Sequence, residues 1–280
     1  MAEGTLETVL RRDRLLVGSA FGVIATFAWA YVLWLSAGMS MSGMNMDGLR
    51  MVPAGRGFMV AAASPWSAVE FTFVFVMWVV MMVGMMAPSA APMILLYARA
   101  GRQARVSGQP FAATGWFAAG YFLAWAAFSL AATLVQWVLE RQALLDARMA
   151  SANLLWGAAV LMAAGLYQWT PIKSACLAHC QSPFRFLMTH GGFRSHVRGC
   201  LQLGLLHGTY CVGCCWILMA LLFVVGVMNV LWIAILALLV LLEKLTPWGL
   251  WVARFAGTAG IAAGAWIVYS SWLAAYVATH

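Results

Sequence analysis

Three thiols and one imidazole lie within nine positions of the stretch LHGTYCVGCCW. His207 and Cys211 are four positions apart, and Cys211 and Cys214 are three apart, so a helix places their side chains on one face. Cys200 lies further along the same face, and Cys215 lies at its edge. Thiolate and imidazole together bind Cu(I) or Zn(II). The spacing therefore predicts a soft-metal site in this segment.

A second group of the same ligand types precedes the first, in the stretch KSACLAHCQ. Cys176, His179 and Cys180 are spaced so that one helical turn would bring them together. Three ligands are one short of a closed tetrahedral zinc site, and they also suit a low-coordinate copper site from which the ion can exchange. His190 and His196 follow in a basic stretch, and we interpret them as ordinary loop residues.

Methionines form a third group, in the segment that contains MMVGMMAPSAAPM. At about 100° per residue they fall into two rows on one broad helix face. The predicted ladder consists of Met77, Met81, Met82, Met85 and Met86, with Glu70 at its outer end. A thioether is a soft ligand, but methionine is also an adaptable packing residue, so both interpretations stay open.

A further run of methionines lies among small polar residues in the stretch GMSMSGMNMDGLRM. It contains Met39, Met41, Met44, Met46 and Met51. Thioethers form no disulfides and select Cu(I) over hard cations, so these residues could capture copper in an oxidising compartment. A flexible loop lying on the bilayer is the alternative.

Composition identifies the environment of these groups. Of the 280 residues 64% are hydrophobic and 9% are charged, and mean hydropathy is +0.88. A soluble domain carries about a quarter charged residues, so water-soluble enzyme classes are excluded. The net charge of +8 is dispersed between apolar runs, which indicates contact with membrane lipid and no binding of nucleic acid. The sequence contains no P-loop or dinucleotide fingerprint, so a nucleotide-driven pump has no support.

The apolar runs predict an all-α membrane protein, a single membrane domain with a bundle of about seven transmembrane helices. The expected spans are 15–38, 66–98, 111–139, 150–169, 200–226, 229–242 and 255–277. Between them we expect a cytoplasmic N-terminal segment at 1–14, an outer Met-rich loop at 39–65 and a cytoplasmic Cys/His loop at 170–199.

Charge distribution orients this bundle. With the N-terminus in the cytoplasm and the C-terminus outside, twelve Lys and Arg residues fall on the cytoplasmic side and four outside. The first apolar run is too long for a cleaved signal, so we expect an uncleaved anchor. All six cysteines then lie in the cytoplasmic loop or in the helix that leaves it, where thiols stay reduced. Glu243 and Lys244 are expected to snorkel or to pair with each other.

Four stretches together resemble a bacterial family of uncharacterised proteins described as predicted metal-binding integral membrane proteins. They are MMVGMMAPSAAPM, LYQWTPIKSACLAHCQSPF, GLLHGTYCVGCCWILMALLF and VMNVLWIAILALLVLLEK, within about 66–250. The resemblance implies a metal-binding membrane protein. It points to Met81, Met82, Met85, Met86, Pro88, Cys176, His179, Cys180, His207, Cys211, Cys214 and Cys215.

These observations favour a Cu(I)-binding protein of the bacterial cytoplasmic (inner) membrane, with Zn(II) as the alternative ion. The leading hypothesis is a multi-pass importer or conduit that passes Cu(I) from methionine sites to Cys/His sites. One alternative is a membrane metalloenzyme that uses copper or iron on a lipophilic substrate, but His207 is the one histidine within a predicted span, so catalysis is less favoured. The other is a non-transporting copper chaperone, assembly factor or sensor, with a copper chaperone or copper enzyme as partner.

Overall fold

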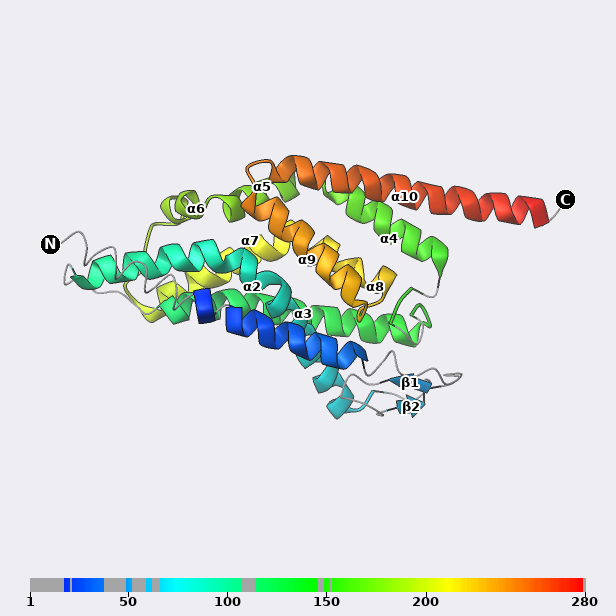
Figure 1. Ribbon diagram of the computed structural model, residues 1–280, viewed down its shortest axis with the longest axis horizontal. Coiled ribbons are helices and arrows are strands. Elements are labelled where there is room, and N and C mark those ends of the chain that lie inside the picture. Colours follow the sequence, from blue (N-terminus) through cyan, green and yellow to red (C-terminus); the bar gives the residue numbers. More distant parts are fainter. Residues whose placement is uncertain are drawn as a thin grey trace.

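The computed structural model describes residues 18–20, 22–37, 49–51, 59–61, 66–106, 114–145, 149–151 and 153–278. Within these residues the chain is predominantly helical. Figure 1 shows the longer helices lying roughly along one axis, with α10 at one edge of the molecule. A short hairpin, β1 (Leu49–Met51) paired antiparallel with β2 (Met59–Ala61), lies at the opposite edge.

The helices follow one another in a simple order. A first helix covers Gly18–Ala37. It is followed by α2 (Ala68–Val106), α3 (Thr114–Arg141), α4 (Leu154–Tyr167), α5 (Pro171–Gln181), α6 (Pro183–Thr189), α7 (Val197–Ala220), α8 (Leu222–Val225), α9 (Val230–Leu245) and α10 (Gly249–Ala278).

Five of the described helical segments are long and apolar enough to cross a membrane. They are Gly18–Ala37, Ala68–Gly101, Thr114–Arg141, Val197–Val225 and Gly249–Val277. Two shorter helices, α4 with 14 residues and α9 with 16, lie where the fourth and sixth spans were predicted. Both fall below the about 20 residues that a perpendicular crossing requires. The helical membrane-protein class therefore agrees with the sequence prediction, while the count of seven and the orientation stay predictions.

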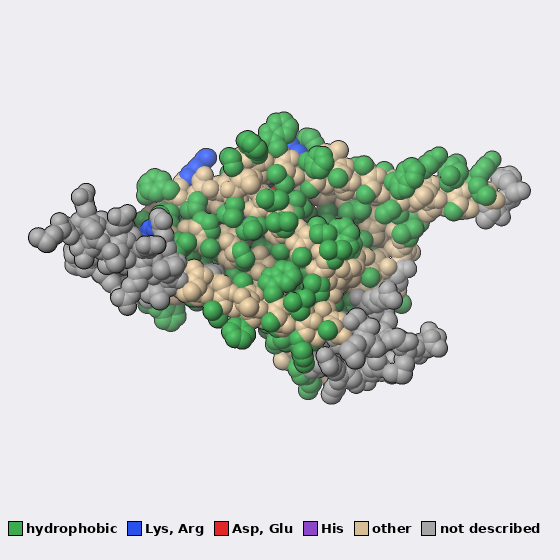
Figure 2. Space-filling view, in the orientation of Figure 1, with side chains coloured by type: hydrophobic (Ala, Val, Ile, Leu, Met, Phe, Trp, Pro, Cys, Tyr) green, Lys and Arg blue, Asp and Glu red, His purple; other side chains and the backbone are tan. Residues whose placement is uncertain are grey.

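Large apolar side chains cover the outer surface of the described helices. Trp251, Phe255, Trp266 and Trp272 of α10 are each more than half exposed. Figure 2 shows hydrophobic side chains spread across the visible face of the described helices, including the part of α10 that extends away from the other helices. An exposed apolar surface of this extent is what hydrocarbon contact requires.

Glycines set the spacing between α3 and α7. A Cβ added to Gly204 would collide with the carbonyl oxygen of Phe117, and one added to Gly120 with that of Leu201. At Gly208 the added Cβ would lie 2.6 Å from the Cβ of Ala124. Small residues let transmembrane backbones approach closely. The two helices are therefore held at a distance that brings the Cys face of α7 against the interior.

A buried ion pair docks α5 against α9. Lys173 Nζ lies 2.5 Å from Glu243 Oε2, and both side chains are fully buried. The Gln168 amide donates to the other Glu243 oxygen at 3.1 Å, and the Gln181 amide donates to the Glu243 carbonyl at 2.7 Å. The expectation that Glu243 and Lys244 snorkel or pair together is wrong. Consecutive side chains diverge around a helix, and here Lys244 extends away from Glu243 into the core.

Candidate functional site

The cysteines of α7 form the centre of the candidate site. Cys211, Cys214 and Cys215 are buried and carry free thiols. The Cys214 and Cys215 thiols donate to the Cys211 carbonyl oxygen at 3.1 and 3.0 Å. This is the local bonding that helical spacing of three and four residues produces.

Helix α5 adds a fourth sulfur from another part of the chain. Cys180 is half-buried and packs against the core cluster that contains Cys211 and Cys214. Its position follows from the docking of α5 by Lys173 and Gln181 onto α9. The two Cys groups that the sequence presented separately therefore meet, and we call Cys180, Cys211, Cys214 and Cys215 the thiol cluster.

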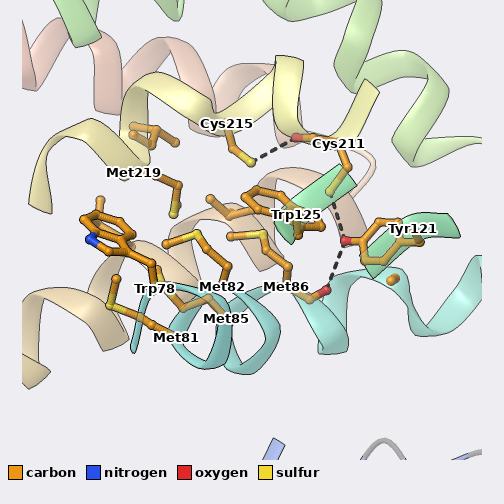
Figure 3. Packing of buried hydrophobic residues seen from close by; sticks show 14 of the residues in the cluster. Trp78, Met81, Met82, Met85, Met86, Tyr121, Trp125, Cys211, Cys215 and Met219 are labelled. Carbon is orange, nitrogen blue, oxygen red and sulfur yellow. Dashed lines mark hydrogen bonds between the residues drawn. The ribbon is translucent and has the colours of Figure 1, made fainter. Parts of the chain in front are cut away.

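The methionine ladder of α2 approaches the thiol cluster from the opposite side. All five of its methionines are buried in the same core cluster as the α7 cysteines. Figure 3 shows Met82 and Met86 extending from α2 toward α7, on the side where Cys215 and Met219 lie. Met81 and Met85 lie further from α7 in the same view. The structure thus places one row of thioethers against the thiols and the other row away from them.

A buried lysine lies where the two kinds of sulfur converge. Lys244 Nζ lies 2.9 Å from Cys211 Sγ, 3.4 Å from Ser89 Oγ and 3.9 Å from Met86 Sδ. An ammonium ion at such a position needs electron-rich partners, because hydrocarbon supplies none. Sequence reasoning missed this role, although a charged residue in an apolar run was the signal.

Tyr121 of α3 completes the surroundings of Cys211. Its hydroxyl lies 3.0 Å from Cys211 Sγ and donates at 3.4 Å to the Met86 carbonyl, as Figure 3 shows. Cys211 is thereby contacted from α3 and α9, besides its own helix. The Cys211 thiol thus links α7 to the neighbouring helices of the site.

The imidazoles lie beside the thiol cluster among aromatic rings. His207 packs against Phe186 at a centroid distance of 4.9 Å and against Tyr121 at 5.8 Å. His179 packs on Tyr210 at 4.3 Å. Within the described residues, neither His207 Nδ1 nor His179 Nδ1 has a hydrogen-bond partner, although both atoms are buried. Burial, followed by the neighbouring His190 and Arg185, lowers the pKa of His179, which favours the neutral form that binds metals.

The other predicted ligands have different surroundings. The Cys200 thiol lies 3.0 Å from the Tyr97 hydroxyl and donates to the Arg194 carbonyl at 3.3 Å. Cys176 packs against Gly213, where an added Cβ would lie 3.0 Å from its sulfur.

Two predictions concern the N-terminal end of α2 and the segment before it. The Glu70 carboxylate accepts from the Ser67 backbone N–H at 2.6 Å, and the Ser67 hydroxyl accepts from the Glu70 N–H at 3.2 Å. This is a capping box at the start of α2, a structural role that the sequence interpretation did not include. Met39, Met41, Met44 and Met46 lie outside the described residues.

The donor set suits a soft monovalent ion. In the described part of the chain, no group of three or more His, Cys, Asp or Glu side chains is arranged to hold a metal ion. Thioethers are not among those residue types, and Cu(I) takes thiolate and thioether ligands. Met82 and Met86 beside the thiol cluster therefore add the soft thioether ligands that Cu(I) accepts to the thiols of α7.

Comparison with known proteins gives one family. A family model described as "PpoB2: copper chaperone" matches residues 75–267. The matched range includes the α2 methionines, the thiol cluster and all the histidines discussed above, and it begins after the predicted outer loop. The searches of curated proteins and of solved structures found no match.

Proposed function

Since this chain belongs to the PpoB2 copper chaperone family, we propose that its helices bind Cu(I) and pass it from methionine sites to Cys/His sites. One observation carries the proposal. The thioethers of Met82 and Met86 face the thiol cluster inside a buried core, so sulfur ligands of two strengths adjoin each other. Soft sulfur is the ligand class that selects Cu(I), and exchange between neighbouring sulfurs moves such an ion without free solution.

The ligand order supports inward movement. In the seven-span topology, with the N-terminus in the cytoplasm, the Met-rich loop 39–65 lies outside the bacterial inner membrane and the Cys/His loop 170–199 lies inside. Thiolates are charged ligands and bind Cu(I) more strongly than thioethers. Copper would therefore pass to sites of increasing affinity, which favours import without nucleotide hydrolysis.

Lys244 gives this path a resident cation. Its ammonium contacts Cys211 and lies near Met86, the two sulfurs that Cu(I) would join. A Cu(I) ion about 4 Å from the Lys244 ammonium would be repelled by about 4 kcal/mol at an effective dielectric constant near 20. We therefore expect Lys244 to move away from these sulfurs when Cu(I) binds between them.

Copper flux into vesicles tests the proposal. Proteoliposomes containing a Cu(I)-responsive internal probe should fill faster than empty vesicles, and Cys211→Ser/Cys214→Ser should abolish the difference. Cys200→Ser is the matched control, because its thiol hydrogen-bonds Tyr97 and Arg194 instead. Wild-type flux equal to that of empty vesicles would refute the conduit.

The family description is also compatible with a second candidate, a non-transporting chaperone that delivers copper to a copper enzyme or another chaperone. Such a protein would bind copper at the same residues. It would show no flux in the vesicle assay, but bound copper would transfer to a co-purified partner. Measuring copper on both proteins after mixing distinguishes the two functions.

A further inference from the structure

We propose that His179 and His190 form a two-imidazole Cu(I) site, separate from the thiol cluster, at which copper is exchanged with its donor or acceptor. The inference rests on the proposed function for the identity of the ion. Sequence spacing gave no sign of this pair, because the two histidines are eleven positions apart on different helices. His179 lies in α5, and His190 is the C-cap residue that follows α6.

The separation of the rings suits a shared ion. Their centroids are 5.6 Å apart and the planes meet at 66°. Imidazoles that bind one ion through nitrogens at about 2.0–2.1 Å have centroids about 5–6 Å apart, depending on the angle at the metal. The pair could therefore bind one ion with little movement of either helix.

The two rings differ in their hydrogen bonding, and each has a nitrogen that could bind metal. His190 Nδ1 lies 2.8 Å from the Phe186 carbonyl oxygen and 3.0 Å from Thr189 Oγ1. A histidine that donates one N–H to a carbonyl is oriented to use its other nitrogen for metal, which here is Nε2. His179 instead has a buried Nδ1 without a hydrogen-bond partner among the described residues. One imidazole is thus fixed in place, and the other keeps a nitrogen without a partner.

Phe186 connects the histidine pair to the interior. Its buried ring lies 4.5 Å from that of His190 and 4.9 Å from that of His207, centroid to centroid. His207 precedes Cys211 by one helical turn on α7. The pair therefore adjoins the thiol cluster through one aromatic residue, while both of its histidines remain half-buried rather than enclosed.

Neighbouring charge favours a monovalent ion at this pair. Arg194 Nη2 donates to the His190 carbonyl at 2.8 Å. After burial and His190, the positive charge of Arg185 is a further cause that lowers the pKa of His179. Repulsion from these guanidinium groups is twice as large for Zn(II) as for Cu(I). Two neutral imidazoles without a carboxylate offer no charge to offset it.

Copper stoichiometry tests the histidine site. Full-length protein, purified anaerobically and saturated with Cu(I), should lose about one ion per chain when His179→Gln/His190→Gln is introduced. His196→Gln is the matched control, because that imidazole is exposed and caps no helix by a side-chain hydrogen bond. His190→Gln alone should also lose the ion, whereas His190→Cys supplies another soft ligand and should restore it, a difference that a merely structural defect would not produce.

Two outcomes overturn the proposal: equal stoichiometry in the wild type and the double variant, or a loss that His190→Cys does not restore. Copper uptake by the same proteins separates this inference from the proposed function. A histidine-dependent ion in a protein without flux would refute the conduit and leave the site intact. Copper flux in a protein whose copper stoichiometry does not depend on the histidines would refute the histidine site and leave the conduit intact.

Discussion

Sulfur atoms of neighbouring residues on α2 have different surroundings, although the residues are alike in type and burial. Met86 Sδ lies 3.9 Å from the Lys244 ammonium, which also contacts Cys211. Met85, the preceding residue, is equally buried but lies on the other row of the ladder. Because the methionine ladder contains both rows, core packing and metal binding can each explain the position of some of its methionines. One row packs the core, and the other faces the thiol cluster.

The two rows should respond differently to removal of sulfur. Met82→Leu/Met86→Leu should weaken Cu(I) binding on the order of tenfold, about 1.4 kcal/mol, because it removes thioethers beside the thiol cluster. Met81→Leu/Met85→Leu should leave the affinity nearly unchanged. Leucine is similar to methionine in volume, so both pairs should cost little stability. Competition with a Cu(I) chelator of known affinity measures the difference, and equal losses in the two variants would contradict the assignment of rows.

At the scale of elements, local sequence patterns predicted which side chains share a helix face. They did not predict the contacts between helices that are far apart in the sequence. The Cys211–Cys214 face follows from helical periodicity alone. The approach of Cys180 to that face depends on the docking of α5, and the spacing of residues along the sequence does not predict that docking. Glu243 and Lys244 were misjudged for the same reason, since their partners come from other helices.

The ion pair of α5 and α9 should dominate the stability of this docking. Lys173→Met removes one partner and leaves the buried Glu243 carboxylate with the Gln168 amide. Breaking a buried pair in this way costs about 3–5 kcal/mol, whereas replacing both partners by apolar residues is often near neutral. We therefore expect a large drop in unfolding temperature in detergent for Lys173→Met and a partial recovery for Lys173→Met/Glu243→Leu. A single variant as stable as the wild type would show that the pair does not hold α5.

For the whole molecule, the direction of copper movement depends on the side of the membrane on which the thiols lie. If α4 and α9 cross the membrane, the chain has seven spans and residues 170–199 are cytoplasmic. If only the five longer segments cross, the same residues face outward. Thiols stay reduced and available for copper only on the cytoplasmic side. The count of spans therefore decides whether the ligand order can favour import.

Labelling of introduced cysteines separates the two topologies. Ser195 is exposed between α6 and α7, and Gln142 is exposed after α3. A membrane-impermeant maleimide applied to intact inner-membrane spheroplasts should label Gln142→Cys under either topology, because residue 142 follows the third span in both. It should label Ser195→Cys only if α4 fails to cross.

We expect Ser195→Cys to react no more than the parent protein until the membrane is permeabilised, since twelve of the sixteen Lys and Arg residues are cytoplasmic only with seven spans. Labelling of Ser195→Cys in intact spheroplasts would place the thiols outside and rule out inward delivery along this ligand order.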